Sequence, residues 1–155
     1  MDIYAPNLEE TLYMIDRPAY DALGAGEAAV DGDLLHRTAG RLLDLGAAIV
    51  GLKLGDRGLY LRTSSDRDRL QSLVGLLPAE LTGWVGRELY APCFRVRVAG
   101  TTGAGDCACA GLLAGLLYGQ SIEAVLLSAA AAGACSVEAA DATSGLPHWD
   151  DVQAR

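Results

Sequence analysis

The sequence predicts a single α/β domain over residues 1–155. Helix-like and strand-like patterns alternate through its first two thirds. The run 47–54 is almost continuously apolar and partly β-branched, which is typical of a strand buried on both faces of a parallel sheet. A glycine-rich loop, 100–106, stands between a predicted strand and a predicted helix. No repeat, low-complexity tract or linker divides the chain.

The composition describes a folded, acidic protein. The 155 residues are 51% hydrophobic and 21% charged, and 12 Lys and Arg against 20 Asp and Glu give a net charge of −8. This composition supports a packed core and differs from that of disordered chains. The acidic excess argues against a nucleic-acid-binding surface, which needs basic residues to neutralise phosphates. A small anion site built from backbone N–H groups remains compatible with it.

Nothing in the sequence predicts export or a membrane span. Met1 is followed directly by Asp2, unlike a signal peptide, and the longest apolar region, 124–137, is shorter than the roughly 20 residues of a membrane-spanning helix. We therefore expect a cytoplasmic protein. The four cysteines include no CxxC pair, and Cys107 and Cys109 point about 200° apart on a helix. We expect reduced, mostly buried thiols rather than a metal site.

Hydrophobic spacing and turn residues predict the elements of the first half of the chain. In order, these are the end of a strand at 1–4, a helix from 6 to about 15, a break at 24–26, a helix over 31–45, a buried strand over 47–54, a turn at 55–58 and an antiparallel strand over 59–62.

The same reasoning predicts the elements of the second half. In order, these are an amphipathic stretch from 66 to 77 that Pro78 ends, strands over 88–91 and 94–98, helices over 104–118 and 121–137, a loop over 141–147 and a short acidic turn from His148.

The loop GTTGAGD at 100–106 predicts an anion site. Gly103 and Gly105 let the backbone bend sharply and approach a ligand. The helix that follows directs its unpaired N–H groups and partial positive charge at the loop, which suits a phosphate group. Asp106 has two interpretations that stay open. It is either a general base for phosphoryl transfer or a carboxylate that complements the helix N-terminus.

Other nucleotide-binding motifs fit less well. Residues 103–108 match the relaxed dinucleotide fingerprint, but a helix at 121 follows where a parallel strand is needed. Residues 24–29 match it too, with no strand before them. A Walker loop is excluded because no Gly-Lys-Ser/Thr follows the glycines.

Three motifs follow one another along the chain: PNxxE at 6–10, KxGxxG at 53–58 and TTGAGD at 101–106. In this order, with an Ala-rich helix and a further loop downstream, they resemble the C-terminal half of the ribokinase-like, or PfkB, carbohydrate kinases. The resemblance covers essentially the whole chain. It implies a three-layer fold with a mostly parallel sheet, present as the C-terminal portion without the N-terminal half and lid.

The resemblance also implies a role for each matching residue. Asp106 is similar to the catalytic base that deprotonates the acceptor hydroxyl, and the N–H groups of Gly103, Ala104 and Gly105 are similar to the anion hole. Glu10 matches the residue that organises Mg²⁺ through water. The residues that match the family's ATP-binding positions are Asn7, Lys53, Gly55, Gly58, Thr101, Thr102, Ala134 and Thr143.

Two motifs also have a structural explanation, and one position departs from the family. Asn7 and Glu10 are a capping pair that would stabilise any helix start, and both roles are compatible. The segment 55–58 is also a tight hairpin turn. Gly100 stands where family members often carry an acidic residue that helps to hold a monovalent cation, which puts potassium activation in doubt.

The function implied by the resemblance is ATP- and Mg²⁺-dependent phosphoryl transfer to a hydroxyl of a sugar or sugar-like acceptor. Family members are usually much longer, so residues 1–155 are expected to be one partial domain that pairs with a missing N-terminal half or with a second copy. Two alternatives stay open: a non-catalytic nucleotide-binding or interaction module, and a kinase of the same fold for a nucleoside or a vitamin-precursor alcohol.

Overall fold

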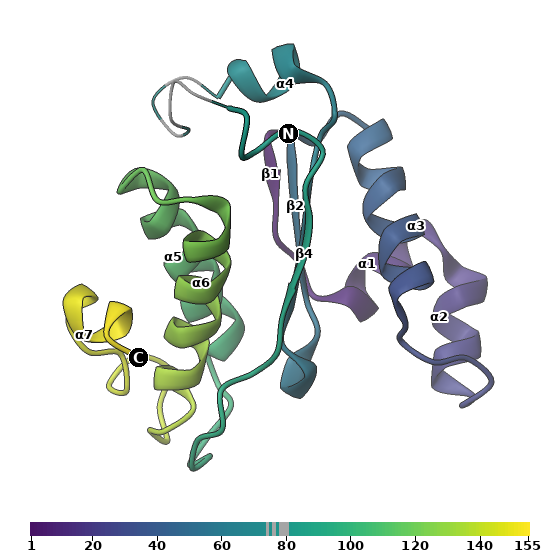
Figure 1. Ribbon diagram of the computed structural model, residues 1–155. Coiled ribbons are helices and arrows are strands. Elements are labelled where there is room, and N and C mark those ends of the chain that lie inside the picture. The colour runs from purple at the N-terminus through teal and green to yellow at the C-terminus, as the bar shows by residue number, and fades with distance from the viewer. Residues whose placement is uncertain (74, 76, 78–80) are drawn as a thin grey trace.

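The computed structural model of the protein describes residues 1–73, 75, 77 and 81–155. A four-stranded sheet stands between α1–α3 on one face and α5–α6 on the other, which gives three layers (Figure 1). The elements are β1 (Ile3–Tyr4), α1 (Leu8–Ile15), α2 (Arg17–Gly24), α3 (Gly32–Asp44), β2 (Ile49–Lys53), the 3₁₀ turn η1 (Gly55–Arg57), β3 (Leu59–Thr63), α4 (Arg67–Gln71), β4 (Glu88–Ala91), α5 (Ala104–Leu117), α6 (Ile122–Ser136) and α7 (Trp149–Gln153).

The described sheet has the order β1-β2-β3-β4 and is mixed. β1 pairs parallel to β2, while β2 with β3 and β3 with β4 pair antiparallel. The α/β class is confirmed. In the described sheet one of the three strand pairings is parallel and two are antiparallel, so this part of the sheet is not mostly parallel. The turn after β2 is too short for a crossover, so it sends β3 straight back beside β2.

The alternation of side chains along β2 sets what lies on each face of the sheet. Ile49 packs in the core beneath α5 and α6, whereas Val50 and Leu52 pack against α1 and α3. Gly51 faces α5, and a Cβ there would lie 3.3 Å from Leu112 Cδ1. The same alternation directs Lys53 toward α5, so the end of β2 meets that helix.

Helices α5 and α6 approach closely through small residues. A Cβ on Gly111 would lie 2.7 Å from the Ser128 carbonyl oxygen, and one on Gly115 would lie 3.2 Å from Val125 Cα. These contacts leave no room for larger side chains along the seam. The close seam fixes the position of α5 beneath the sheet.

Several helices begin where the sequence predicts, because a capping side chain fixes the start. Asn7 Oδ1 accepts from the Glu10 N–H at 2.8 Å, and the Asp31 and Ser121 side chains cap α3 and α6 in the same way. Helix α2 was not predicted. Asp16 caps it and Pro18 lies in its first turn, and Ala19, Tyr20 and Leu23 are partly buried against the core on this face of the sheet.

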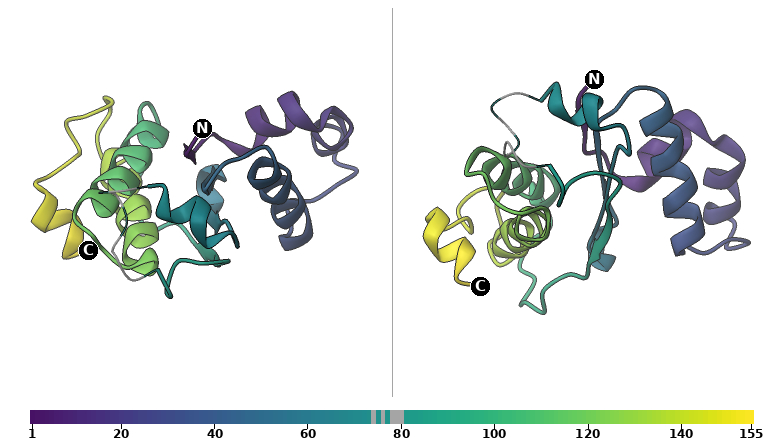
Figure 2. Two further views of the ribbon diagram at one scale, coloured as in Figure 1. Left: turned by 90° about the horizontal axis from the view of Figure 1, so that it is seen from above. Right: turned by 45° about the horizontal axis from the view of Figure 1, so that its top comes forward.

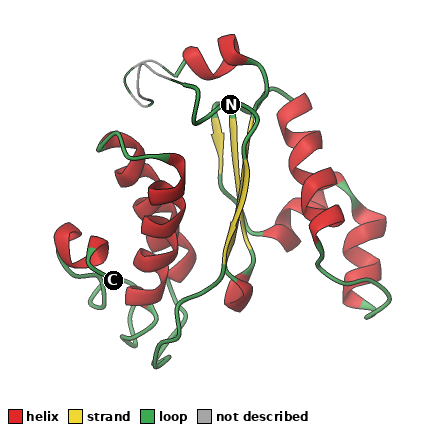
Figure 3. Ribbon diagram, in the orientation of Figure 1, coloured by secondary structure: helices red, strands yellow, loops and turns green. Residues whose placement is uncertain are grey.

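Two other expectations for the chain need correction. The segment 94–98 is not a strand but a loop (Figure 3), because no described strand pairs with it. Phe94 and Val96 are nevertheless partly buried, as their alternation suggests. The predicted amphipathic stretch 66–77 contains only the short helix α4. Its residues 74 and 76, and Pro78 at its end, lie outside the described residues.

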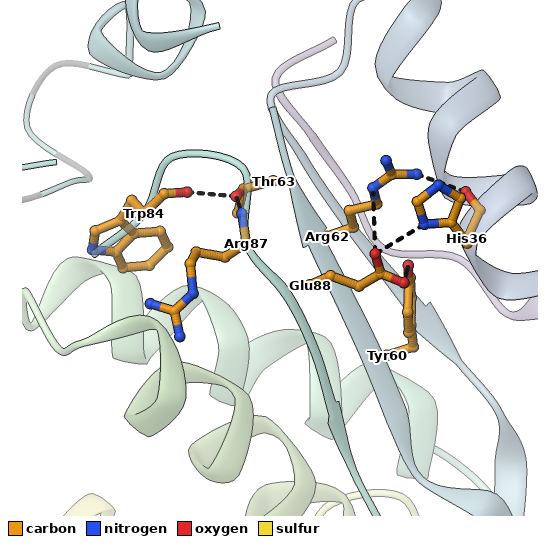
Figure 4. A network of polar contacts seen from close by, with 7 residues as sticks. All are labelled: His36, Tyr60, Arg62, Thr63, Trp84, Arg87 and Glu88. Atoms are coloured by element: carbon orange, nitrogen blue, oxygen red, sulfur yellow. Dashed lines mark hydrogen bonds and ion pairs between the residues drawn. The ribbon is translucent and has the colours of Figure 1, made fainter. Parts of the chain in front are cut away.

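A polar network joins α3 to the β3–β4 pair on the sheet face away from α5 (Figure 4). The Tyr60 hydroxyl donates to Glu88 at 2.8 Å, His36 Nδ1 lies 2.9 Å from the same carboxylate, and Arg62 donates to the His36 carbonyl. Burial raises the pKa of Tyr60. Burial also acts on Glu88, but the hydrogen bonds from Tyr60 and His36 outweigh it and lower the pKa of that carboxyl. His36 therefore has a structural partner.

One side of the molecule is formed by α1, β1 and α5, and the opposite side by β4 and α6 (Figure 2). The Cys109 thiol on α5 donates to the Ala5 carbonyl directly after β1, at 3.3 Å, while α6 lies against β3 and β4. The outer edge of β1 has no neighbouring strand in the described part of the sheet.

Candidate functional site

The end of β2 and the first turn of α5 meet in one place. The Lys53 side chain lies across the start of α5, with Nζ 3.3 Å from the point where a Cβ of Gly105 would stand. The ammonium group donates to Cys109 Sγ at 3.6 Å. No carboxylate in the described part of the chain forms an ion pair with it. A positive charge therefore lies beside the positive end of a helix.

The start of α5 presents unpaired backbone donors. The N–H groups of Gly103, Gly105 and Asp106 have no acceptor among the described residues. The Ala104 N–H instead bonds to the Thr101 carbonyl at 3.3 Å. Two of the three predicted anion-hole donors are thus available, and the N–H of Asp106 is a further donor that sequence reasoning missed.

Gly103 is required by its conformation and by its surroundings. Its φ is +79°, and a Cβ would lie 2.7 Å from Ala142 Cβ. The loop that carries Ala142 therefore packs directly against the start of α5. Any larger residue at position 103 would displace this loop or the first turn of α5.

A cavity of about 430 Å³ opens beside Lys53 and the start of α5. This volume is within the range of small-molecule sites. Phe94, Val96, Val98 and Val137 give it an apolar wall. The predicted site residues that line it are Lys53, Gly55, Gly58, Thr101, Ala104, Gly105 and Ala134.

Asn7 lies on the other side of Lys53, in a neighbouring hollow of about 570 Å³ that Lys53 and Gly55 also line. Asn7 and Lys53 form an isolated parallel bridge, and the Lys53 N–H donates to the Pro6 carbonyl at 3.0 Å. The PNxxE and KxGxxG motifs are thus adjacent in space. Gly58 has its own structural reason, because a Cβ there would lie 2.1 Å from the Ala91 carbonyl oxygen.

Five predicted site residues, Gly103 among them, do not line either hollow. Asp106 and Glu10 are exposed, and neither carboxylate has a hydrogen-bond or ion-pair partner among the described residues. Thr102 and Thr143 are also exposed outside both hollows.

The turn that holds Thr143 is organised by Asp141. The Ser144 hydroxyl and the Ser144 and Thr143 N–H groups all donate to its carboxylate. These hydrogen bonds, led by the one from the Ser144 hydroxyl, lower the pKa of Asp141 to about 2. The turn is therefore closed by a carboxylate that stays ionised in mild acid.

Within the described ranges, no three His, Cys, Asp or Glu side chains gather in a metal-binding group. The four cysteines are free, and Cys107 and Cys135 are buried. No helix in this part of the chain has the length and apolar character to cross a bilayer.

The pfkB family carbohydrate kinase model matches residues 38–149, well over half of the 155 residues. The chain belongs to this family. The matched residues include the Lys53 segment and the glycine-rich loop of this chain, whereas the PNxxE motif at 6–10 precedes them. A search of curated proteins gives no match.

Several kinases of known structure share the fold of this chain. Ribokinase from Arabidopsis thaliana, complexed with ribose and ATP, is 22% identical with a TM-score of 0.72, over 98% of this chain and 39% of that one. Ribokinase from Thermotoga maritima is 26% identical with a TM-score of 0.66, over 99% and 41%. Aminoimidazole riboside kinase from Salmonella enterica, with aminoimidazole riboside and an ATP analog, is 25% identical with a TM-score of 0.63, over 99% and 41%.

Other matching structures were solved with ATP and Mg²⁺ or with potassium. The present chain spans about two fifths of the length of each of the kinases named above.

Proposed function

We propose that the chain is the nucleotide-binding and catalytic portion of an ATP-dependent kinase that phosphorylates a hydroxyl of a sugar or sugar-like acceptor. The observation that carries this proposal is the unpaired positive charge at the start of α5. The Lys53 ammonium and the N–H groups of Gly103, Gly105 and Asp106 lie there, and within the described residues no carboxylate pairs with the ammonium and no acceptor bonds to these N–H groups. A triphosphate supplies the negative charge that this arrangement lacks.

The cavity beside this charge suits the rest of the nucleotide. Its apolar wall, with Ala134 at one side, would cover the adenine, and Gly55 would lie along the phosphates. Thr101 lines the same cavity, and Thr102 follows it in the loop. Thr143 would take part from the neighbouring turn. Small residues on α5 and α6 leave the room that the base and ribose need.

Asn7 and Glu10 fit a magnesium ion that arrives with ATP. Mg²⁺ is usually held by one or two carboxylates, phosphate oxygens and several waters, so it needs no cluster of protein ligands. Glu10 is exposed and unpaired among the described residues, while Asn7 Oδ1 caps α1. Glu10 would hold the ion through water. The bound ion would offset phosphate charge during transfer.

Asp106 is suited to act as a base. Its carboxylate is exposed and unpaired among the described residues, so its lone pairs can accept the proton of an acceptor hydroxyl. The N–H groups of Gly103, Gly105 and Asp106 would stabilise the charge on the transferring phosphoryl group. Holding the hydroxyl and the phosphate in line would supply much of the acceleration.

Gly100 supports the doubt about potassium activation. A Cβ at this position would lie 2.9 Å from the Ala140 carbonyl oxygen. The acidic side chain that family members often carry there would collide with this backbone. We therefore propose no monovalent-cation site at this loop.

Two features support the proposal that a partner covers one side of the molecule: a row of exposed residues on α5, and the edge of β1, which has no neighbouring strand among the described residues. Residues 106, 110, 113 and 117 follow helical spacing, and Leu113 and Leu117 are 45% and 68% exposed. We propose that an N-terminal half or a second copy covers this side and brings acceptor-binding residues to Asp106. Sedimentation velocity is expected to show concentration-dependent association, and a sharp monomer at all concentrations would contradict a second copy.

A non-catalytic nucleotide-binding module is the second candidate, because the chain spans only two fifths of the solved kinases it matches. Phosphoryl transfer from ATP to a panel of sugars, nucleosides and vitamin-precursor alcohols separates the candidates, with and without an added N-terminal half. Transfer supports the kinase and identifies the acceptor. Nucleotide binding without transfer in either preparation supports the module.

A further inference from the structure

Cys109 contacts the Lys53 ammonium. It follows Gly105 by one helical turn on α5, so both residues face the end of β2. The thiol has one proton, which it donates to the Ala5 carbonyl at 3.3 Å. Lys53 Nζ donates to the same sulfur at 3.6 Å. The sulfur thus accepts from Lys53 while its proton is held by the segment that follows β1.

This contact is the one hydrogen bond of the Lys53 ammonium among the described residues. The backbone of Lys53 is fixed by the Pro6 carbonyl, so only the flexible four-carbon stem can move. The positive end of α5 opposes a cation in this place, and the sulfur is the acceptor that offsets this effect. Cys109 does not line the 430 Å³ cavity, so it would act on a bound nucleotide only through Lys53.

We propose that Cys109 is a positioning residue of the nucleotide phosphate site, which holds Lys53 over the start of α5. This inference rests on the proposed function. A sulfur is a weak acceptor. The contact therefore holds the Lys53 ammonium in place but leaves it able to bind a phosphate group that arrives. A bound nucleotide then meets a lysine that is already in place.

Lys53 is the only lysine of the 155 residues, which makes the contact directly observable. A chain labelled with ¹³C and ¹⁵N in lysine gives a single set of side-chain NMR signals. We compare Cys109→Val, which has no acceptor, with Cys109→Ser, which keeps a donor and an acceptor. Cys135→Val is the matched control, because this buried thiol lies on α6 and contacts Arg155 instead of Lys53.

In the ligand-free protein, Cys109→Val is expected to shift the Lys53 Cε and Nζ signals toward those of a solvated lysine. Cys109→Ser and Cys135→Val are expected to leave them near the wild-type values. A void of only about 10 Å³ lies beside Cys109, so thermal unfolding checks that valine is tolerated. If it is not, Cys109→Ala provides the comparison. Unchanged Lys53 signals in a folded variant without the sulfur would overturn the inference.

Isothermal titration with MgADP then tests the positioning role. Cys109→Val is expected to weaken binding about threefold to tenfold, the range of one hydrogen bond, and to have no effect in a Lys53→Met background. Equal weakening in both backgrounds would assign Cys109 a purely structural role and overturn the proposal. If the wild-type chain does not bind MgADP while the signals still shift, nucleotide binding fails and the contact alone is confirmed.

Discussion

Lys53 and Gly105 lie against each other, with the Lys53 Nζ 3.3 Å from the position of a Gly105 Cβ. The register of β2 directs Lys53 toward α5, and Gly51 lets α5 approach the same strand. Glycine at 105 therefore leaves space between a cation and the unpaired donors of a helix start. We propose that a phosphate group binds in this space.

Removing the charge of Lys53 tests its share in binding. Lys53→Met is expected to weaken MgADP binding about tenfold or more, because a hydrogen bond to a charged group is typically worth about 1.5–3 kcal/mol. The measurement is isothermal titration. Arg57→Gln removes a nearby charge that does not line the same cavity, and an equal loss there would indicate general attraction rather than a specific contact.

Replacing Asp106 tests the proposed base. In a preparation that transfers phosphate, Asp106→Asn is expected to lower kcat about 10²–10⁴-fold, the usual contribution of a general base, while MgADP affinity stays within a few-fold. Steady-state kinetics and titration give the two values. Asp151→Asn, in the exposed first turn of α7, is the control. Near wild-type turnover by Asp106→Asn would show that another group accepts the proton.

The seam between α5 and α6 predicts opposite effects at two glycines. Gly111→Ala is expected to lower the free energy of unfolding by about 1–3 kcal/mol, because its Cβ would lie 2.7 Å from the Ser128 carbonyl oxygen. Gly133→Ala meets only ordinary contacts at 3.4 Å and is expected to be neutral or to stabilise α6 by up to about 1 kcal/mol. Denaturant unfolding compares them. Similar values would contradict the close packing described for Gly111.

The Asp141 turn predicts a specific pH response. Hydrogen bonds hold the folded-state pKa of Asp141 near 2, below its ordinary value, so its contribution to stability is present above that ordinary value and is lost as pH falls toward 2. Carboxyl NMR titration is expected to give a midpoint near 2. Ser144→Ala removes a hydroxyl donor and raises the midpoint, whereas Thr143→Ala keeps its backbone donor and leaves it unchanged. A midpoint near 4 in the wild type would contradict this.

Local chemistry made much of this structure predictable. Asn7, Asp31 and Ser121 cap helices where the sequence places them, because a cap depends only on neighbouring residues. The unpaired N–H groups of Gly103 and Gly105 were predicted for the same reason, whereas that of Asp106 was missed and that of Ala104 bonds to the Thr101 carbonyl. Alternation at 94–98 indicates an extended segment but cannot supply a partner strand, so that prediction was wrong.

The rest of the site depends on packing between distant segments. The contact of Lys53 with Cys109 needs the register of β2 and the closeness of α5, and neither follows from local spacing. Asp106, Leu113 and Leu117 share the solvent-facing side of α5. This arrangement could not be predicted, because it depends on which side of the helix the rest of the molecule covers. The functional roles of all the predicted site residues, Glu10, Thr102 and Thr143 among them, stay predictions.

Thermal unfolding with and without MgADP tests the phosphate site most directly, on the wild type, Gly105→Asp and Gly32→Asp. Gly105→Asp places a carboxylate beside Lys53, whereas Gly32 begins α3 in open space and controls for the added charge. At about 100 times the dissociation constant, binding adds roughly 2.7 kcal/mol, a rise in Tm of about 5–10 °C. We expect this rise in the wild type and Gly32→Asp but not in Gly105→Asp. An equal rise in all three, or none in the wild type, would contradict a phosphate site at the start of α5.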